Sequence, residues 1–159
     1  MKYFILSAIV ATMFYVGGCS IKYNTESNTQ KQLDSLKDQI AKMKPGLGEY
    51  MLSVQIHHSK LWFAGVKANW PLAKFEIDEI REQLAHATEV ETDRVEIKSL
   101  PMIFPILDSI DHSIAAKDEV GFKNHFTLLT NTCNSCHANN HFEFIKIKTP
   151  ETPFFTNQE

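Results

Sequence analysis

The last third of the chain places two cysteines on the apolar face of a predicted helix, which strongly constrains the fold. Asp118, a typical helix N-cap, precedes this stretch. Residues spaced by three and four positions share one face of an α-helix. The residues of this face recur at intervals of four, three, four and three positions: Phe122, Phe126, Leu129, Cys133 and Cys136. We therefore predict a long helix that points both cysteines the same way as the buried aromatic residues.

Helical spacing of apolar residues recurs in the rest of the chain. It covers 31–43, 47–66, a stretch from Asn69-Trp70-Pro71 to about residue 87, and 100–116. The charged stretch 88–98 reads as a connection, and only 142–148 shows a trace of strand alternation. Short connections favour antiparallel neighbours. We predict an all-α fold, an antiparallel four-helix bundle with an extended C-terminal tail beyond residue 141.

The N-terminal residues predict export and a lipid anchor. Lys2 precedes an apolar run, 3–16, which is too short to span a bilayer. The run ends in Val16-Gly17-Gly18-Cys19, which resembles the lipobox of bacterial lipoproteins, where the cysteine is lipidated; an ordinary signal peptide with a chance cysteine is the alternative. We predict a signal peptide over 1–18, a flexible tether over 19–30 and one folded domain over 31–159. By resemblance to the sorting rules of Gram-negative lipoproteins, Ser20 after the cysteine favours anchoring to the outer membrane, on its periplasmic side.

Two adjacent histidines fall on opposite sides of the predicted helix 47–66. On a helical wheel His57 lies with Glu49, Ser53 and Lys60, so we expect it to face water. His58 falls on the other side, within an apolar stripe that also contains Met51 and Leu61. The net charge of −3 and the absence of a basic stripe give no indication of nucleic-acid binding.

The segment Cys133-Asn134-Ser135-Cys136-His137 is a C-x-x-C-H motif, typical of covalent attachment of haem c. Two thiols one helical turn apart can form thioether bonds to the two vinyl groups of one macrocycle, and the adjacent histidine can bind the iron. A disulfide between the cysteines remains an alternative. A thioredoxin-like redox pair would need a preceding strand. A zinc site would need a fourth ligand, such as His125 or His141.

Four amphipathic helices with this motif near the end of the last one resemble the class II c-type cytochromes, the cytochrome c prime group. The resemblance covers roughly residues 47–141. It implies one haem held inside the bundle, with a methionine ligand or an apolar residue on the first helix facing the iron. It also implies pairing into homodimers through the first two helices. Asn140 and His141 stand where the family usually has an aromatic and a basic residue, so the usual tuning of the proximal histidine is not expected here.

The distal side of the haem can be located by helix length. The 118–137 helix would be about 28 Å long, and an antiparallel first helix then places Met51 about 7 Å and His58 about 18 Å from the haem level. Met51 is the first candidate for a sixth iron ligand, with a role as core filler as the alternative. His58 is the second candidate, as a ligand, a distal hydrogen-bond donor or a core histidine. We expect His57, His86, His112 and His125 to be surface or packing residues.

These features predict a periplasmic mono-haem c-type cytochrome, anchored to the membrane by Cys19, that transfers single electrons to redox partner proteins. If no side chain fills the distal position, a five-coordinate iron would instead bind or sense NO or CO. The sequence shows neither a second metal motif nor a set of residues suited to nucleophilic catalysis, so we predict no enzymatic activity.

Overall fold

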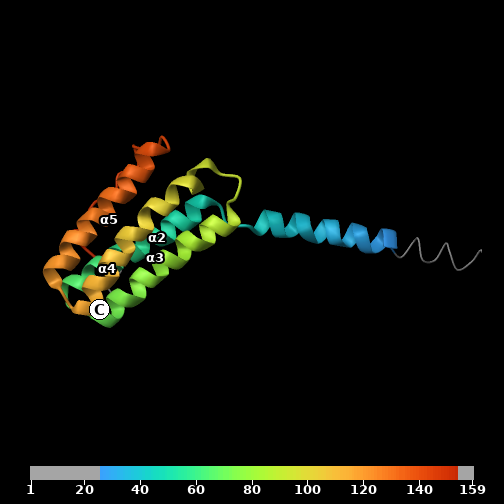
Figure 1. The fold of residues 1–159 in the computed structure, drawn as a ribbon. Coiled ribbons are helices and arrows are strands. Elements are labelled where there is room, and N and C mark those ends of the chain that lie inside the picture. The colour runs from blue at the N-terminus through green and yellow to red at the C-terminus, as the bar shows by residue number, and fades with distance from the viewer. Residues whose placement is uncertain (1–25, 154–159) are drawn as a thin grey trace, which may run out of the picture. The chain divides into compact units, whose positions relative to one another are not determined.

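The computed structural model describes residues 26–153, and all regular secondary structure in that range is helical (Figure 1). The all-α prediction is therefore confirmed. The stretch 142–148, which showed a trace of strand alternation, forms irregular backbone after the last helix. The predicted signal peptide and Cys19 lie outside the described residues, as does the part of the predicted tether before residue 26.

The chain divides into two units, Met1–Lys44 and Pro45–Glu159. In the first unit, residues 26–43 are helical, so residues 26–30, which we expected in a flexible tether, extend the predicted helix 31–43. The apolar side chains of this helix are exposed, and the second, larger compact unit begins at Pro45. Pro45 and Gly46 separate this helix from the next, as the proline predicts.

Helices α2 (Leu47–Val66) and α3 (Trp70–Val90) form the first pair of the compact unit. The bounds of α2 match the prediction. The side chain of Asn69 caps α3 by accepting a hydrogen bond from the backbone N–H of Leu72 at 3.3 Å, and Pro71 lies in the first turn. Proline suits this position because its missing N–H would have no helical partner there. Helix α3 runs three residues beyond the predicted end at Ala87.

The predicted helix 100–116 is two elements in the structure. A 3₁₀ helix, η1 (Val95–Ile103), leads into α4 (Phe104–Ala116), with Pro105 in the first turn of α4. A proline inside a continuous α-helix would remove a backbone hydrogen bond, and the change of helix type places Pro105 where that loss is tolerated. The predicted connection 88–98 is shorter than expected, because α3 and η1 each extend into it.

Helix α5 (Glu119–Asn139) carries the cysteine motif. Asp118 is its N-cap, as predicted, and its Oδ1 accepts hydrogen bonds from the backbone N–H groups of Val120 and Gly121 at 3.1 and 3.0 Å. Helix α5 packs against α4, η1 and α2. The C-terminal half of α5 therefore lies beside both α2 and η1, the two elements that enclose the candidate site.

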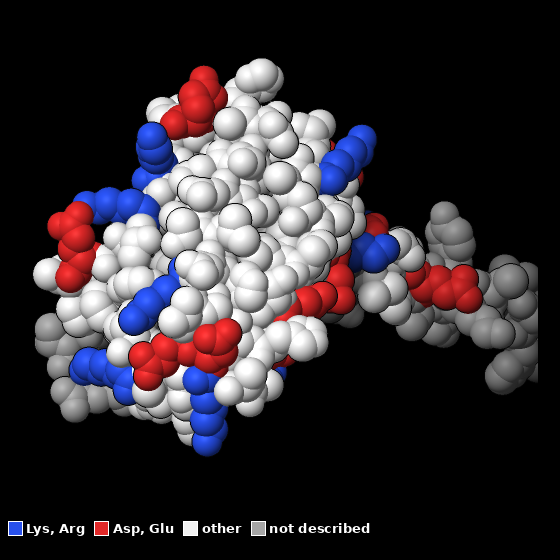
Figure 2. Space-filling model, turned by 60° about the vertical axis from the view of Figure 1, so that its left-hand side comes forward, with Lys and Arg blue, Asp and Glu red and all other residues white. Residues whose placement is uncertain are grey.

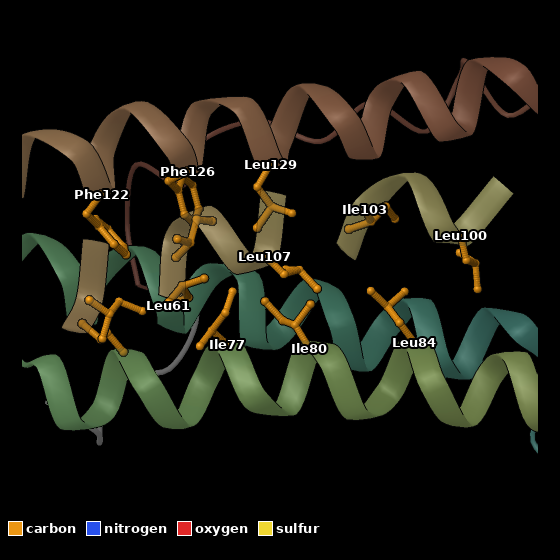
Figure 3. Close-up of a cluster of buried hydrophobic side chains, with 14 of the residues drawn as sticks. Leu61, Ile77, Ile80, Leu84, Leu100, Ile103, Leu107, Phe122, Phe126 and Leu129 are labelled. Carbon is orange, nitrogen blue, oxygen red and sulfur yellow. The ribbon is translucent and has the colours of Figure 1, made fainter. Parts of the chain in front are cut away.

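The core is built from the apolar stripes that the sequence predicted. Every helix of the compact unit contributes side chains that are almost fully buried, and burying each large one stabilises the fold by about 1.5–3 kcal/mol. Figure 3 shows the resulting cluster, with Leu61 from α2, Ile77, Ile80 and Leu84 from α3, Leu100 and Ile103 from η1, Leu107 from α4, and Phe122, Phe126 and Leu129 from α5.

The orientation predicted for His57 is wrong. Its side chain is only 15% exposed, and its Nδ1 lies 2.7 Å from Oε2 of Glu76 on α3. Lys60 forms an ion pair with the other oxygen of Glu76, at 2.9 Å, and Glu76 is completely buried. The helical wheel grouped the polar residues of α2 correctly, but α3 covers that face with a buried carboxylate, which attracts the histidine and the lysine.

Candidate functional site

A cleft of about 380 Å³ opens between α2, α5, η1 and the segment that follows α5. Its size falls within the usual range for small-molecule and cofactor sites, and its lining is mostly apolar. All five residues that the sequence singled out for a cofactor line this one cleft: Met51, His58, Cys133, Cys136 and His137. The fold thus brings together residues that lie more than 70 positions apart in the chain.

Cys133 and Cys136 are both free thiols, one helical turn apart on α5. Burial, and to a lesser degree the neighbouring Cys136, raises the pKa of Cys133 to about 12. Burial also raises the pKa of Cys136. The two side chains are therefore neutral thiols near pH 7. A thioredoxin-like pair reacts through a thiolate of lowered pKa, so this environment does not favour the thioredoxin-like alternative.

His137 has one ring nitrogen fixed by the backbone. Its Nδ1 lies 2.7 Å from the carbonyl oxygen of Ile145, eight residues further along the chain. A carbonyl oxygen can only accept a hydrogen bond, so Nδ1 carries the proton and Nε2 keeps its lone pair. This arrangement suits a histidine that binds a metal through Nε2, since such histidines usually donate their other N–H to a carbonyl or a carboxylate.

His58 lies in the core beside the cleft and is 4% exposed. Its Nε2 lies 2.9 Å from Oγ1 of Thr130, and the Thr130 hydroxyl donates its own proton to the carbonyl of Phe126 at 3.0 Å. Thr130 must therefore accept from His58, which fixes the proton on Nε2. The ring also packs on Phe126, with centroids 4.4 Å apart. Burial lowers the pKa of His58 to about 4, so the ring is neutral near pH 7.

Met51 lies on the same helix as His58, seven residues earlier, and is half-buried along the cleft. Its thioether sulfur is a weak hydrogen-bond acceptor with electron pairs that a soft metal can share. Nε2 of His58 carries the proton of its hydrogen bond, so Nδ1 keeps the lone pair of the neutral ring. Both predicted distal candidates therefore keep a donor atom, and both line the cleft.

The remaining histidines lie outside the cleft. Nδ1 of His125 is 2.8 Å from Oγ of Ser113, and His112 bonds to the carbonyl of Asp108 at 2.7 Å. His86 and His141 are exposed. Among residues 26–153, no group of three or more His, Cys, Asp or Glu side chains is arranged to hold a metal ion. The zinc alternative therefore finds no fourth ligand in the part of the chain that the structure describes.

Two parts of the cleft are formed by residues that the sequence did not single out as site residues. Phe142, Ile145 and Ile147, from the segment after α5, form one wall, and Arg94 and Glu96 from the loop before and the start of η1 bring a charged pair to the lining. Nη2 of Arg94 lies 2.7 Å from Oε1 of Glu96. The length of the tail beyond residue 141 indicated a segment that could cover one edge of a haem, whereas nothing in the charged stretch 88–98 marked out Arg94 and Glu96.

The outer surface near the motif carries few charges. Helix α5, on the left of Figure 1, turns toward the viewer in Figure 2, and a broad area there is free of Lys, Arg, Asp and Glu, with both signs of charge around its edges. This agrees with the sequence, which has none of these residues between Lys123 and Glu143. Among the described helices, none has the length and apolar character that crossing a membrane requires. Comparison of the chain with protein-family models, curated proteins and solved structures finds no match.

Proposed function

We propose that this chain is a periplasmic mono-haem c-type cytochrome, held at the membrane by a lipid on Cys19, that acts in one-electron transfer. The observation that carries the proposal is the convergence of Cys133, Cys136, His137 and Met51 on one apolar cleft. The motif supplies the attachment chemistry, and the fold supplies a cavity lined by a candidate ligand from a distant helix.

The residues of the cleft fit haem c in their chemistry. Cys133 and Cys136 would carry the two thioether links, and the Nε2 atom of His137 would bind the iron, because its Nδ1 is engaged with Ile145. When bound, haem supplies an iron that gains and loses one electron. Apolar side chains of α2, η1 and the segment after α5 would cover much of the haem and limit its contact with water.

We further propose that α2, α3, α4 and α5 form an antiparallel four-helix bundle like that of the class II c-type cytochromes. Short connections between α2 and α3 and between α4 and α5, together with the packing of α2 on α3, α3 on α4 and α4 on α5, support this arrangement. In such a bundle the first helix faces the distal side of the haem, where this chain has Met51.

A ligand set of His137 and Met51 favours electron transfer over gas binding. If His137 and Met51 both held the iron, no position would remain open for a gas molecule, and methionine ligation would raise the reduction potential. The competing function, binding of NO or CO by a five-coordinate iron, is favoured by one observation: the residues around Met51 on α2 that line the cleft include the apolar Leu47 and Val54.

The test is to express the full-length protein with a haem-maturation system and measure the mass and visible spectrum of the mature form. We expect the mass of one added haem and a low-spin ferrous spectrum that CO does not change. A high-spin spectrum that shifts with CO would support gas binding instead. A colourless protein, with no mass beyond the polypeptide and its lipid, would overturn both functions.

Variants at the three cysteines test the haem links and the lipid anchor in the same experiment. Cys133→Ala and Cys136→Ala should each keep one thioether link and so retain haem on denaturation, whereas the double variant should release it. Cys19→Ala should retain the haem and leave the membrane fraction, because the lipid anchor depends on that cysteine. If Cys19→Ala stays with the membranes, the lipid anchor is wrong, while the haem proposal is unaffected.

A further inference from the structure

We propose that residues 142–147 form a strap that positions His137, and that Asn134, between the two cysteines of the motif, is the residue that holds the strap in place. Only the effect of the strap on iron depends on the proposed function. The positioning of His137 is a property of the polypeptide and can be tested without haem.

Asn134 holds the far end of the strap by pairing with one backbone unit. Its Oδ1 accepts a hydrogen bond from the N–H of Ile147 at 2.8 Å, and its Nδ2 donates to the carbonyl oxygen of Ile147, also at 2.8 Å. The side-chain amide thus satisfies both polar groups of this residue, as a neighbouring strand would. An aspartate or a serine could not make both bonds, because only an amide side chain presents a donor and an acceptor side by side.

The near end of the strap is fixed where α5 ends. His141 adopts a left-handed conformation (φ 65°), which reverses the chain, and the N–H of Phe142 donates to the carbonyl of His137 at 2.8 Å. Asn140 supports this turn, since its Nδ2 donates to the carbonyl of Cys136 at 2.7 Å. Ile145 lies between the two fixed ends, and its own N–H donates to the carbonyl of Phe142 at 2.9 Å.

This arrangement directs the carbonyl of Ile145 onto Nδ1 of His137, at 2.7 Å. A hydrogen bond from Nδ1–H to a carbonyl fixes the tautomer and the ring orientation of a ligating histidine and makes its other nitrogen more basic. A more basic ligand stabilises ferric iron more than ferrous iron, so the strap lowers the reduction potential. The strap also covers the cleft with the side chains of Phe142, Ile145 and Ile147.

The test compares Asn134→Ala with Asn131→Ala, which changes an exposed asparagine one turn earlier on the same helix. In the full-length protein without haem, we expect Asn134→Ala to increase amide hydrogen exchange at Ile147 and Ile145. The ring nitrogens of His137, observed by NMR, should change from the Nδ1–H form to a mixture of tautomers. Asn131→Ala should behave as the parent in both measurements.

A second variant disrupts the same contact by changing Ile147 instead of Asn134. Ile147→Pro removes the backbone N–H that donates a hydrogen bond to Asn134, and it leaves Asn134 itself unchanged. If the two residues act through one contact, the effects of Ile147→Pro and Asn134→Ala on the exchange of Ile145 should be less than additive in the double variant. Additive effects, or an exchange rate and tautomer in Asn134→Ala equal to those of Asn131→Ala, would overturn the positioning role.

The haem-loaded protein provides the final readout. We expect the midpoint potential of Asn134→Ala to be higher than that of the parent and that of Asn131→Ala to be unchanged. An unchanged potential in Asn134→Ala, with haem present, would overturn the effect of the strap on iron. If the parent binds no haem, the proposed function and this effect fail together, whereas the positioning of His137 is decided by the exchange and tautomer measurements alone.

Discussion

Nε2 of His58 and Oγ1 of Thr130 lie 2.9 Å apart, and their hydrogen bond joins α2 to α5 inside the core. The two residues are 72 positions apart in the chain. Since Thr130 donates its own proton to a backbone carbonyl, it can accept only from a ring nitrogen that carries hydrogen. The neutral imidazole satisfies this contact without a buried charge, so the fold stabilises the neutral form of His58.

The buried His58 should make the free energy of unfolding depend on pH. Burial lowers its pKa from the ordinary 6.5 to about 4. Between these values the unfolded chain binds a proton that the folded chain does not, so stability is fully present above pH 6.5 and is lost as the pH falls toward 4. The shift corresponds to about 3 kcal/mol over this window. Urea unfolding at a series of pH values measures it.

The variant His58→Gln serves as the control for this pH dependence. It loses the titrating ring, so it should be less stable than the parent near neutral pH but should lose less stability on acidification. The difference between the two pH profiles isolates the contribution of His58 from that of the other histidines. If the unfolding free energies of parent and variant changed in parallel with pH, the fold would not disfavour protonation of His58.

Met51 should determine the spin state of the haem-loaded protein. Met51→Leu keeps a side chain of similar volume in the cleft but removes the sulfur, so the change in packing should cost less than about 1.5 kcal/mol. We expect the ferrous protein to become high-spin and to bind CO, because the distal position is left open. Visible spectra with and without CO provide the measurement.

Met102→Leu provides a matched control for that substitution. Met102 is an exposed methionine of η1 and does not line the cleft. Its spectrum should equal that of the parent. A low-spin spectrum in Met51→Leu would exclude Met51 as the ligand. His58→Gln, the one other distal candidate, would then be the variant to measure.

Lys60 should contribute to stability well beyond an ordinary surface lysine, because its partner Glu76 is completely buried. Lys60→Met leaves that carboxylate with His57 as its close partner, which should lower the free energy of unfolding by about 3 kcal/mol. Lys123→Met, an exposed lysine on α5, should change it by less than about 0.5 kcal/mol. Thermal unfolding checks both.

Adding Glu76→Gln tests the cause of that loss. If the destabilisation in Lys60→Met comes from a buried charge that has lost its main partner, the neutral amide should restore part of the stability. If the double variant is less stable than Lys60→Met, then Lys60 stabilises the fold by packing its aliphatic stem rather than by pairing with Glu76.

The sequence predicted those parts of the molecule that depend on local periodicity. The bounds of α2, the helix start at Asn69-Trp70-Pro71, the cap Asp118 and the buried stripe of α5 all follow from residues close together in the chain. The sequence could not predict which side chains of one helix contact those of another. The burial of His57 against Glu76 is of this second kind, since a helical wheel describes one helix at a time.

In the candidate site, too, local spacing predicted some features, whereas contacts between distant segments could not be predicted. The cysteine motif and the inward direction of Met51 and His58 could be read from spacing, and all of them line the cleft. The bonds from Asn134 to Ile147 and from His137 to Ile145 could not be predicted, because they depend on how the chain turns back after α5. Asn134 occupies a position of the motif that tolerates many residues in general, so its type gave no signal.

Gly65 should resist substitution although it lies inside a helix. Glycine within a helix usually costs about 1 kcal/mol relative to alanine, so Gly→Ala should be stabilising wherever there is space. A Cβ at Gly65 would lie 2.1 Å from the ring of Phe122, which is itself fully buried and packed against Trp62 and Trp70, so the ring cannot move aside. We expect Gly65→Ala to lower the free energy of unfolding by about 1–3 kcal/mol, as overpacked cores do.

Gly48→Ala, in the first turn of the same helix with no atom near the new Cβ, should instead raise it slightly. Urea unfolding of the two variants side by side gives opposite signs if α2 and α5 approach as closely as this contact indicates, and equal signs would show that they do not.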